Sequence, residues 1–185
     1  MSRIEKKGDA TELETRIADA IQASHDSQDE QSKKLFANLK ITGAKKVDFD
    51  GGSVIIVVVP YKQISLYRNA QGVLIPDLEK KLEAQVIIVG KRRALPKTPL
   101  PNRRFKAIRP YGRTLRSVNE CLLDDVVFPT TIVGKRIHYD SHGKQTTHVI
   151  LDQNDRTRVE EKLAGFAAAY HRLTGLNTVF EIATH

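Results

Sequence analysis

The sequence predicts a mixed α/β (α+β) fold, with a mixed sheet that includes two β-hairpins, packed helices and a long basic loop. Three observations support this class. Short apolar runs such as Val54–Val59 are bounded by turn residues, as strands are. Elsewhere, apolar residues recur at helical spacing. Hydrophobic residues make up 40% of the 185 positions, enough for a packed core, so we expect one compact domain over residues 1–185.

Residues 1–40 are predicted to form a pair of helices. A capping box at Thr11–Glu14 precedes apolar residues at helical spacing, so a helix should begin near residue 12 and end before Asp26. A second capping box, Ser27–Glu30, precedes a shorter amphipathic run that extends to about Lys40. The N-terminal quarter is therefore expected to be helical.

A first β-hairpin is predicted after these helices. The β-prone runs Ile41–Phe49 and Ser53–Val59 flank Asp50–Gly52, and an Asp-Gly pair is a favoured hairpin turn. The second run is apolar at almost every position, which is typical of a strand buried on both faces. This strand is expected to lie at the centre of the core.

A mostly helical stretch follows Pro60. Gly72 and Pro76 are expected to interrupt it, because glycine weakens a helix and proline removes a backbone donor and clashes with the preceding turn. We therefore place the helix proper from Ile75 onward, ahead of a third strand at Gln85–Gly90.

A basic segment, residues 91–113, begins directly after the third strand; we call it the arm. Between Ala84 and Asn119 the chain carries ten basic residues and no Asp or Glu. Because the whole chain has 30 basic and 22 acidic residues, the remainder is close to neutral. The ten are Lys91, Arg92, Arg93, Lys97, Arg103, Arg104, Lys106, Arg109, Arg113 and Arg116. Prolines throughout this segment exclude a regular helix or sheet, so we expect an extended loop.

A local excess of positive charge predicts a polyanionic partner, most often nucleic acid. Phe105 and Tyr111 lie among the cations and can stack on unpaired bases. Arginine predominates over lysine and suits bidentate contact with phosphate. Lys135 and Arg136, on a predicted strand, extend the basic surface. A solvated, disordered loop is the alternative interpretation, because blocks of like charge are often disordered.

The remaining elements are a helix, a second hairpin, another helix and a final strand. An apolar stripe that includes Leu115 predicts the first helix, and the turn at residues 140–143 predicts the hairpin. The second helix ends at Gly175, a residue type expected at a C-terminal cap. The predicted ranges are Thr114–Asp125 for the first helix, Ile132–Tyr139 and Gln145–Leu151 for the hairpin, 159–173 for the second helix and Val179–Ile182 for the strand.

The cysteine and histidine residues do not form a recognisable reactive or metal-binding motif. Cys121 is the only cysteine, so no intramolecular disulfide or multi-thiolate site can form. Its place on an apolar stripe predicts a buried, inert thiol. His138, His142 and His148 lie near one another, but turn histidines are more often solvated polar side chains than metal ligands.

Carboxylate pairs and glycine-lysine pairs do not predict catalysis either. Asp124–Asp125 and Glu160–Glu161 are adjacent on helices, where such side chains point in different directions and commonly face solvent. Gly90–Lys91 and Gly134–Lys135 lack the other residues of a phosphate-binding loop. We therefore expect no catalytic residue, metal, cofactor or small-molecule substrate. The start of the chain lacks a signal-like apolar core, and no run is long enough to cross a bilayer, so we expect an intracellular protein without membrane contact.

Five short strings, most of them in the second half of the chain, stand out as a set. They are DLEKKL at 77–82, VIIVGKRRALPK at 86–97, RTL at 113–115, LTG at 173–175 and, most specific of all, LLDDVVFPTTIVGKRIHYDSHGK at 122–144. These strings resemble a eukaryote-type family, that of ribosomal protein seven of the small subunit. The resemblance covers most of the chain from about Val54 onward.

Members of that family are structural components of the small ribosomal subunit that contact its ribosomal RNA and take part in maturing that RNA. The resemblance implies RNA contacts in the arm and at Gly134–Arg136, neighbouring small-subunit proteins as partners, and a cytoplasmic location with nucleolar or nuclear passage during assembly. The implied RNA-binding residues are Lys91, Arg92, Arg93, Lys97, Arg103, Arg104, Phe105, Lys106, Arg109, Tyr111, Arg113, Arg116, Lys135 and Arg136. A free-standing RNA-binding assembly or regulatory factor, or a protein–protein interaction module, remains the alternative.

Overall fold

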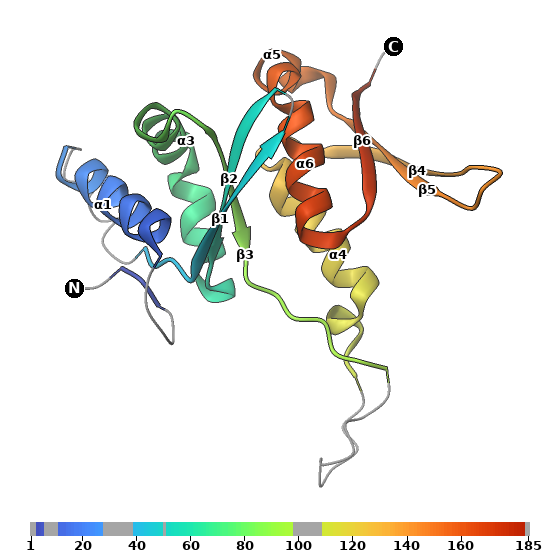
Figure 1. The fold of residues 1–185 in the computed structure, drawn as a ribbon, viewed down its shortest axis with the longest axis horizontal. Coiled ribbons are helices and arrows are strands. Elements are labelled where there is room, and N and C mark those ends of the chain that lie inside the picture. The colour runs from blue at the N-terminus through green and yellow to red at the C-terminus, as the bar shows by residue number, and fades with distance from the viewer. Residues whose placement is uncertain (1–2, 6–10, 28–38, 50, 98–108, 184–185) are drawn as a thin grey trace, which may run out of the picture.

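The computed structural model describes residues 3–5, 11–27, 39–49, 51–97 and 109–183, and the strands of this part form two three-stranded sheets (Figure 1). In each sheet two antiparallel strands form a hairpin, and the third runs parallel to the hairpin's second strand. The mixed α/β class and both hairpins are confirmed, with the strands divided between two sheets. The strands are β1 (Gly43–Phe49), β2 (Gly52–Val59) and β3 (Gln85–Gly90) in the first sheet and β4 (Ile132–Tyr139), β5 (Gln145–Leu151) and β6 (Asn177–Ile182) in the second.

The helices repeat one order of elements twice. A helix precedes each hairpin, and another helix joins that hairpin to the parallel strand, giving α1-β1-β2-α3-β3 and then α4-β4-β5-α6-β6, although no repeat is evident in the sequence. The helices are α1 (Glu12–Ser27), α3 (Ile64–Leu82), α4 (Leu115–Val127), the short α5 (Arg156–Val159) and α6 (Leu163–Thr174). No helix in the described ranges is long and apolar enough to cross a membrane.

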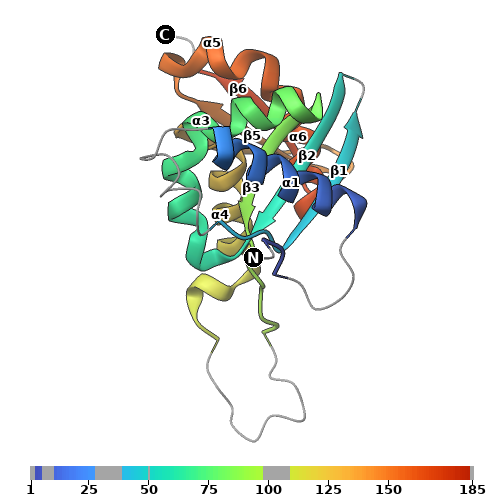
Figure 2. The same ribbon diagram turned by 90° about the vertical axis from the view of Figure 1, so that its left-hand side faces the viewer.

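Helices and sheets alternate in four layers. Figure 1 shows α1 and α3 on one side of the first sheet and α6 and α4 on the other, followed by the second sheet. Figure 2 gives the view from the side of α1, in which α3 and α4 both lie on the β3 side of the first sheet. Within the described residues, the second sheet therefore has a helical layer on one face only.

Alternating apolar residues of the first sheet pack into two separate hydrophobic cores. Ile55 and Ile88 belong to the cluster with α1 and α3. Ile56 and Ile87, their neighbours in the chain, belong to the cluster with α4, α6 and the second sheet. All four are almost completely buried. The uninterrupted apolar runs of β2 and β3 thus follow from burial on both faces, as predicted.

The N-terminal helix begins where its capping box predicts. Thr11 donates its backbone N–H to Glu14 Oε2 at 3.0 Å, and α1 starts at the next residue, Glu12. The second predicted N-terminal helix falls mainly on residues 28–38, which lie outside the described residues.

The prediction that the third helix begins at Ile75 is wrong, because α3 is continuous from Ile64 to Leu82 and contains both Gly72 and Pro76. Pro76 cannot donate a hydrogen bond to the carbonyl four residues earlier, which belongs to Gly72. Both residues are exposed, so water can bind the carbonyl that proline leaves free. The helix tolerates the two residues because they share its solvent side.

The last predicted helix is divided by a 3-10 turn. The segment 159–173 forms the end of α5, a turn at Glu160–Lys162 and α6. Gly175 has φ of 75° and donates its N–H to His171 O at 2.8 Å, so the predicted glycine cap is confirmed. The final strand begins at Asn177, slightly before the predicted start.

Candidate nucleic-acid interface

The arm leaves the body as two linked segments. The outgoing segment runs from the end of β3 to Lys97, and the returning segment enters a 3-10 turn at Tyr111–Arg113 before α4 (Figure 1). Leu95 donates its backbone N–H to Arg113 O at 2.9 Å, and Arg109 Nη1 donates to Leu95 O at 3.0 Å. These two bonds tie the segments together at the base of the arm.

A buried carboxylate anchors the point where β3 becomes the arm. Asp125, on α4, is 2% exposed. It accepts hydrogen bonds from Gly90 N–H at 3.1 Å and from Arg68 Nη2 at 3.0 Å, and it forms an ion pair with Arg92. Burial opposes the charge of Arg92, but the hydrogen bond and the Coulomb attraction from Asp125 outweigh it and raise the pKa of Arg92 above its ordinary value.

Gly90 makes room for this anchor. A Cβ atom at this position would lie 2.7 Å from Ile64 Cδ1, 3.2 Å from Arg92 Nη1 and 3.4 Å from Asp125 Oδ2. A side chain here would therefore push against the ion pair and against the first turn of α3. The absence of a side chain allows β3, α3 and α4 to meet where the arm begins.

The expectation that both residues of the Asp124–Asp125 pair face solvent is wrong for the second. Asp124 is exposed, whereas Asp125 points into the protein. Adjacent helical residues are rotated by about 100° from each other, so one can face solvent while the other faces the core. The signal that could have found the anchor is the arginine at position 92, two residues after a strand buried on both faces.

The predicted arm residues fall into three groups. Most of those at its base have exposed side chains: Lys91, Arg93, Lys97, Tyr111, Arg113 and Arg116. Arg92 and Arg109 are half-buried, because Asp125 and Leu95 O engage them. Arg103, Arg104, Phe105 and Lys106 lie outside the described residues.

An apolar surface accompanies the exposed cations at the base of the arm. Tyr111 is 73% exposed and Leu115 is 64% exposed. Leu115 belongs to the apolar stripe that predicts this helix, but its side chain is exposed, because α4 extends beyond the body at this end (Figure 1). Arg116 Nε lies 3.2 Å from Glu120 Oε1, in an exposed pair one helical turn apart.

The basic pair on the second hairpin is not continuous with the arm. Lys135 and Arg136 are exposed neighbours on β4, so their side chains point to opposite faces of the sheet. The hairpin and the arm also project from the body in different directions (Figure 1). The predicted site residues that the structure describes thus lie on two separate surfaces.

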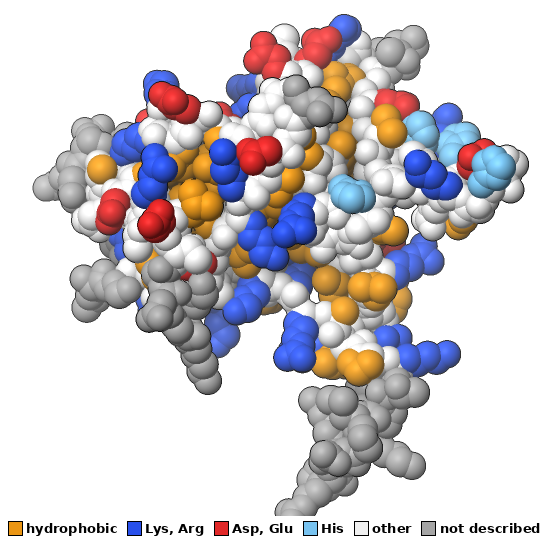
Figure 3. Space-filling model, viewed as in Figure 1, with side chains coloured by type: hydrophobic (Ala, Val, Ile, Leu, Met, Phe, Trp, Pro, Cys, Tyr) orange, Lys and Arg blue, Asp and Glu red, His pale blue; other side chains and the backbone are white. Residues whose placement is uncertain are grey.

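Basic side chains predominate on one part of the face drawn in Figure 3. Lys and Arg occupy its lower part, around the route from β3 to α4, with few Asp or Glu among them, whereas both kinds lie next to one another at the top and left. This basic part of the face is on the side from which the arm projects.

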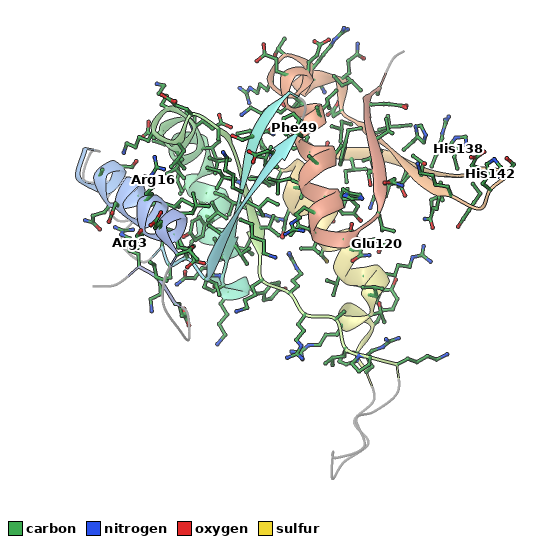
Figure 4. The ribbon with its side chains drawn as sticks, in the orientation of Figure 1. Arg3, Arg16, Phe49, Glu120, His138 and His142 are labelled. Atoms are coloured by element: carbon green, nitrogen blue, oxygen red, sulfur yellow. The ribbon has the colours of Figure 1, made fainter. Side chains whose placement is uncertain are left out.

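The histidines of the second hairpin form a small polar cluster. His138 and His142 lie along the projecting hairpin (Figure 4). His138 meets His148 edge to face at 4.9 Å between ring centroids, and His148 Nδ1 lies 2.7 Å from Glu181 Oε1. Among the described residues no group of three or more His, Cys, Asp or Glu side chains is arranged to hold a metal ion. Cys121 is half-buried.

Comparison with known proteins identifies relatives along nearly the whole chain. Residues 2–182 match the family described as ribosomal protein S7e. The chain is 38% identical over 173 residues to small ribosomal subunit protein eS7 of Schizosaccharomyces pombe, covering 92% of this chain and 88% of that protein. It is 39% identical over 179 residues to small ribosomal subunit protein eS7z of Arabidopsis thaliana, covering 96% of this chain and 92% of that protein.

A third relative is equally similar. Small ribosomal subunit protein eS7 of Candida albicans is 39% identical over 174 residues, which cover 93% of this chain and 92% of that protein. The matched region includes the arm, its buried anchor and both hairpins. The chain therefore belongs to the ribosomal protein S7e family, as its sequence motifs predict, and is a structural ribosomal protein, not an enzyme.

Proposed function

We propose that this chain is a constituent of the small ribosomal subunit that binds small-subunit ribosomal RNA through its arm and contributes to maturation of that RNA and to subunit assembly. The observation that carries the proposal is the charge of residues 84–119, which include ten basic and no acidic side chains. Neutralisation of phosphates by such a segment releases counterions and supplies affinity, while the shape of the folded RNA supplies specificity.

The anchored base of the arm supports this function. The ion pair of Arg92 with Asp125 and the bond of Arg109 to Leu95 O hold both segments in place. The direction in which the chain leaves the body at Lys91 and Arg93 is therefore set by the fold. A preorganised base reduces the conformational entropy lost when RNA binds.

The two partly engaged arginines have a supporting role in this proposal. Arg92 and Arg109 position the arm, and the exposed cations at its base contact phosphates directly. Tyr111, with an exposed ring beside Arg113, is placed to stack on an unpaired base. Lys135 and Arg136 form a second, separate RNA contact on the hairpin.

The near-neutral remainder of the chain faces neighbouring proteins or solvent in this proposal. Without the arm and its flanks, acidic and basic residues are almost equal in number. A single domain at the periphery of the particle, with RNA on the side of the arm, fits this distribution. The protein would act in the cytoplasm on ribosomes after passage through the nucleolus or nucleus during assembly.

Sedimentation of a cell lysate tests the proposal. Low magnesium splits the subunits, and raised salt then strips weakly held proteins. We expect the chain to co-migrate with the small subunit in stoichiometric amount and to resist the salt wash. Migration as a free protein, or loss at modest salt, would instead favour a free-standing RNA-binding assembly or regulatory factor.

A matched pair of charge variants locates the contact. Glu in place of Arg93, Lys97 and Arg113 changes exposed side chains at the base of the arm. Glu in place of Arg16, Lys45 and Arg172 makes the same change in net charge at exposed positions elsewhere. Only the first set should reduce incorporation into the subunit.

A further inference from the structure

A groove of about 560 Å³ lies beside β3, between α3 and the end of α4. Its remaining wall comes from α5 and the turn that leads to α6. Although α3 and α4 cover opposite faces of the first sheet, Figure 2 shows both helices at its β3 edge. This volume lies within the range of about 300–1,000 Å³ that is typical of ligand pockets. None of the exposed cations of the arm is among the lining residues, and the proposed RNA contact does not use the groove.

The groove runs along the unpaired edge of the first sheet, where Ile88 is 4% exposed. In the order β1-β2-β3, β3 pairs on one side only within the described part of the chain. Lys91 donates its N–H toward β2, to Val59 O at 2.7 Å. Successive residues of a strand direct their backbone N–H and C=O groups to opposite sides of the strand. The even-numbered residues of β3 therefore direct these groups away from β2.

Carboxylates accept hydrogen bonds from the backbone at both ends of this edge, and its centre has no such partner among the described residues. Val86 donates its N–H to Glu79 Oε1 at 3.4 Å, and Gly90 donates to Asp125 Oδ2 at 3.1 Å. Between them, Ile88 has no hydrogen-bond partner on this side among the described residues, and it lines the groove. An extended peptide can add to such an edge by main-chain hydrogen bonds.

Two buried polar side chains on the groove wall also have no partner. Gln71 and Thr130 are each 6% exposed, and both line the groove. Within the described ranges Gln71 Oε1 accepts no hydrogen bond, and the hydroxyl of Thr130 neither donates nor accepts one. Buried polar atoms are normally paired, so these two oxygens are unsatisfied points in the wall behind the groove surface. Between them the walls are apolar, with Ile75 and Phe128 among the lining side chains.

The charge of the groove is positive. Its lining includes three basic side chains, Arg68, Arg158 and Lys162, and no acidic residue among those that the structure describes. Lys162 is neutralised by Glu79 at 2.6 Å. Arg68 shares the single carboxylate of Asp125 with Arg92, which leaves an excess of positive charge there.

Arg158 adds to that excess. Its side chain is exposed, and no ion pair engages it within the part of the chain that the structure describes. An acidic occupant complements these charges. Apolar walls and an open strand edge suit a peptide better than an RNA backbone, which offers neither apolar side chains nor strand hydrogen bonds.

We propose that this groove binds an extended acidic segment of a neighbouring protein in the assembled small subunit. The segment pairs with the edge of β3 at Ile88, packs an apolar side chain between Ile75 and Phe128, and directs a carboxylate to Arg158. The inference rests on the proposed function, because it assigns the partner to the same particle.

Photo-crosslinking in purified small subunits tests the inference. The photoreactive residue benzoylphenylalanine replaces Gly72, an exposed groove residue of α3 whose added Cβ would meet no atom within 4 Å. The matched control places it at Val73, which is exposed at 44% but does not line the groove. We expect position 72 to crosslink to one protein segment, identified by mass spectrometry, in which Asp or Glu alternates with apolar residues. Position 73 should not crosslink to that segment.

Other outcomes separate the two proposals. A nuclease-sensitive crosslink, a crosslink within the chain itself, or no crosslink in subunits that contain the chain would overturn the peptide groove and leave the proposed function intact. Failure of wild-type chain to enter the subunit would overturn both.

A charge variant tests the acidic character of the partner. Arg158→Glu should reduce the crosslink yield from position 72 by about tenfold, because an attractive pair becomes a repulsive one. Arg172→Glu, an exposed change of equal charge on α6, should leave the yield unchanged. An equal yield from both variants would overturn the assignment of an acidic segment.

Discussion

Arg92 lies near the start of the arm, and its guanidinium forms an ion pair with the buried carboxylate of Asp125 on α4. Arg68 of α3 binds the same carboxylate, and each of the two arginines also lies over an aromatic ring, Tyr61 for Arg92 and Phe128 for Arg68. One carboxylate therefore joins the arm to two helices from opposite halves of the chain.

Removal of this carboxylate should destabilise the fold. Asp125→Ala leaves the guanidinium of Arg92, whose side chain is only 14% exposed, without its buried partner. Loss of one partner of a buried pair typically costs about 3–5 kcal/mol, and we expect a value near the lower end. Urea unfolding measures the free energy of unfolding, with Asp124→Ala as the exposed control. Equal losses in the two variants would contradict the anchor.

A methyl group at position 90 should loosen the same junction. Gly90→Ala places its Cβ against Ile64 and Arg92, and we expect the free energy of unfolding to fall by about 1 kcal/mol, the low end for overpacking. Thermal unfolding would then shift by about 2–4 °C for a chain of this size. Gly112→Ala, whose Cβ would meet no atom within 4 Å, should show no loss.

Binding of small-subunit ribosomal RNA should depend strongly on salt. Each phosphate contact contributes about 0.9 to the slope of log affinity against log salt concentration. Glu in place of Arg93, Lys97 and Arg113 should weaken binding and reduce this slope by about three. Filter binding across a salt series measures both quantities. A slope that stays the same in the variant would place the phosphate contacts elsewhere.

The aromatic ring at the base of the arm should contribute in a different way. Tyr111→Ala should weaken RNA binding by about 1–3 kcal/mol if the ring stacks on a base, with little change in the salt slope. Tyr139→Ala, which removes a ring of similar exposure from the second hairpin, is the control. The same filter-binding assay measures the RNA affinity of both variants. An equal loss of affinity in the two would argue against stacking at the arm.

Alkaline pH should destabilise the protein through Tyr67. The hydroxyl of Tyr67 donates to Lys40 O at 3.0 Å, and burial raises the pKa of Tyr67 well above its ordinary value. The folded state therefore keeps this proton at pH values where the unfolded chain loses it, so stability falls as pH rises above about 10.

Comparison of variants isolates this contribution. Tyr67→Phe should be less stable at neutral pH, because Lys40 O loses its donor, but its stability should decline less steeply above about pH 10. Tyr61→Phe, which removes an exposed hydroxyl, serves as the control in urea unfolding at pH 8 to 11. Parallel declines in wild type and Tyr67→Phe would contradict the assignment.

The features that could be predicted best from sequence are those that depend on residues adjacent in the chain. The turns at residues 50–52 and 140–143 predicted both hairpins, and Gly175 predicted the end of α6. These features are set by local backbone preferences. The continuity of α3 is harder to predict, because Gly72 and Pro76 are each unfavourable in a helix, whereas their common solvent side makes both tolerable.

Long-range relationships were harder to predict. Asp125 meets Arg92 and Arg68, which lie 33 and 57 residues away in the chain, and no local pattern specifies such pairs. The division into two sheets likewise depends on which strand each helical connection brings alongside a hairpin. The charge of the arm could be identified from sequence, and Arg92 so soon after a buried strand indicates an anchor, but its partner could not be identified, because burial of Asp125 results from tertiary packing.

The core that α4 and α6 share with β2 and β3 gives the arm a further property. Apolar residues from both sides of the arm, such as Ile56 and Phe166, belong to one cluster. The halves before and after the arm are therefore held together by noncovalent packing as well as by the chain. A protease cut between Lys97 and Arg109 should yield two fragments that remain associated under native conditions and separate only in denaturant.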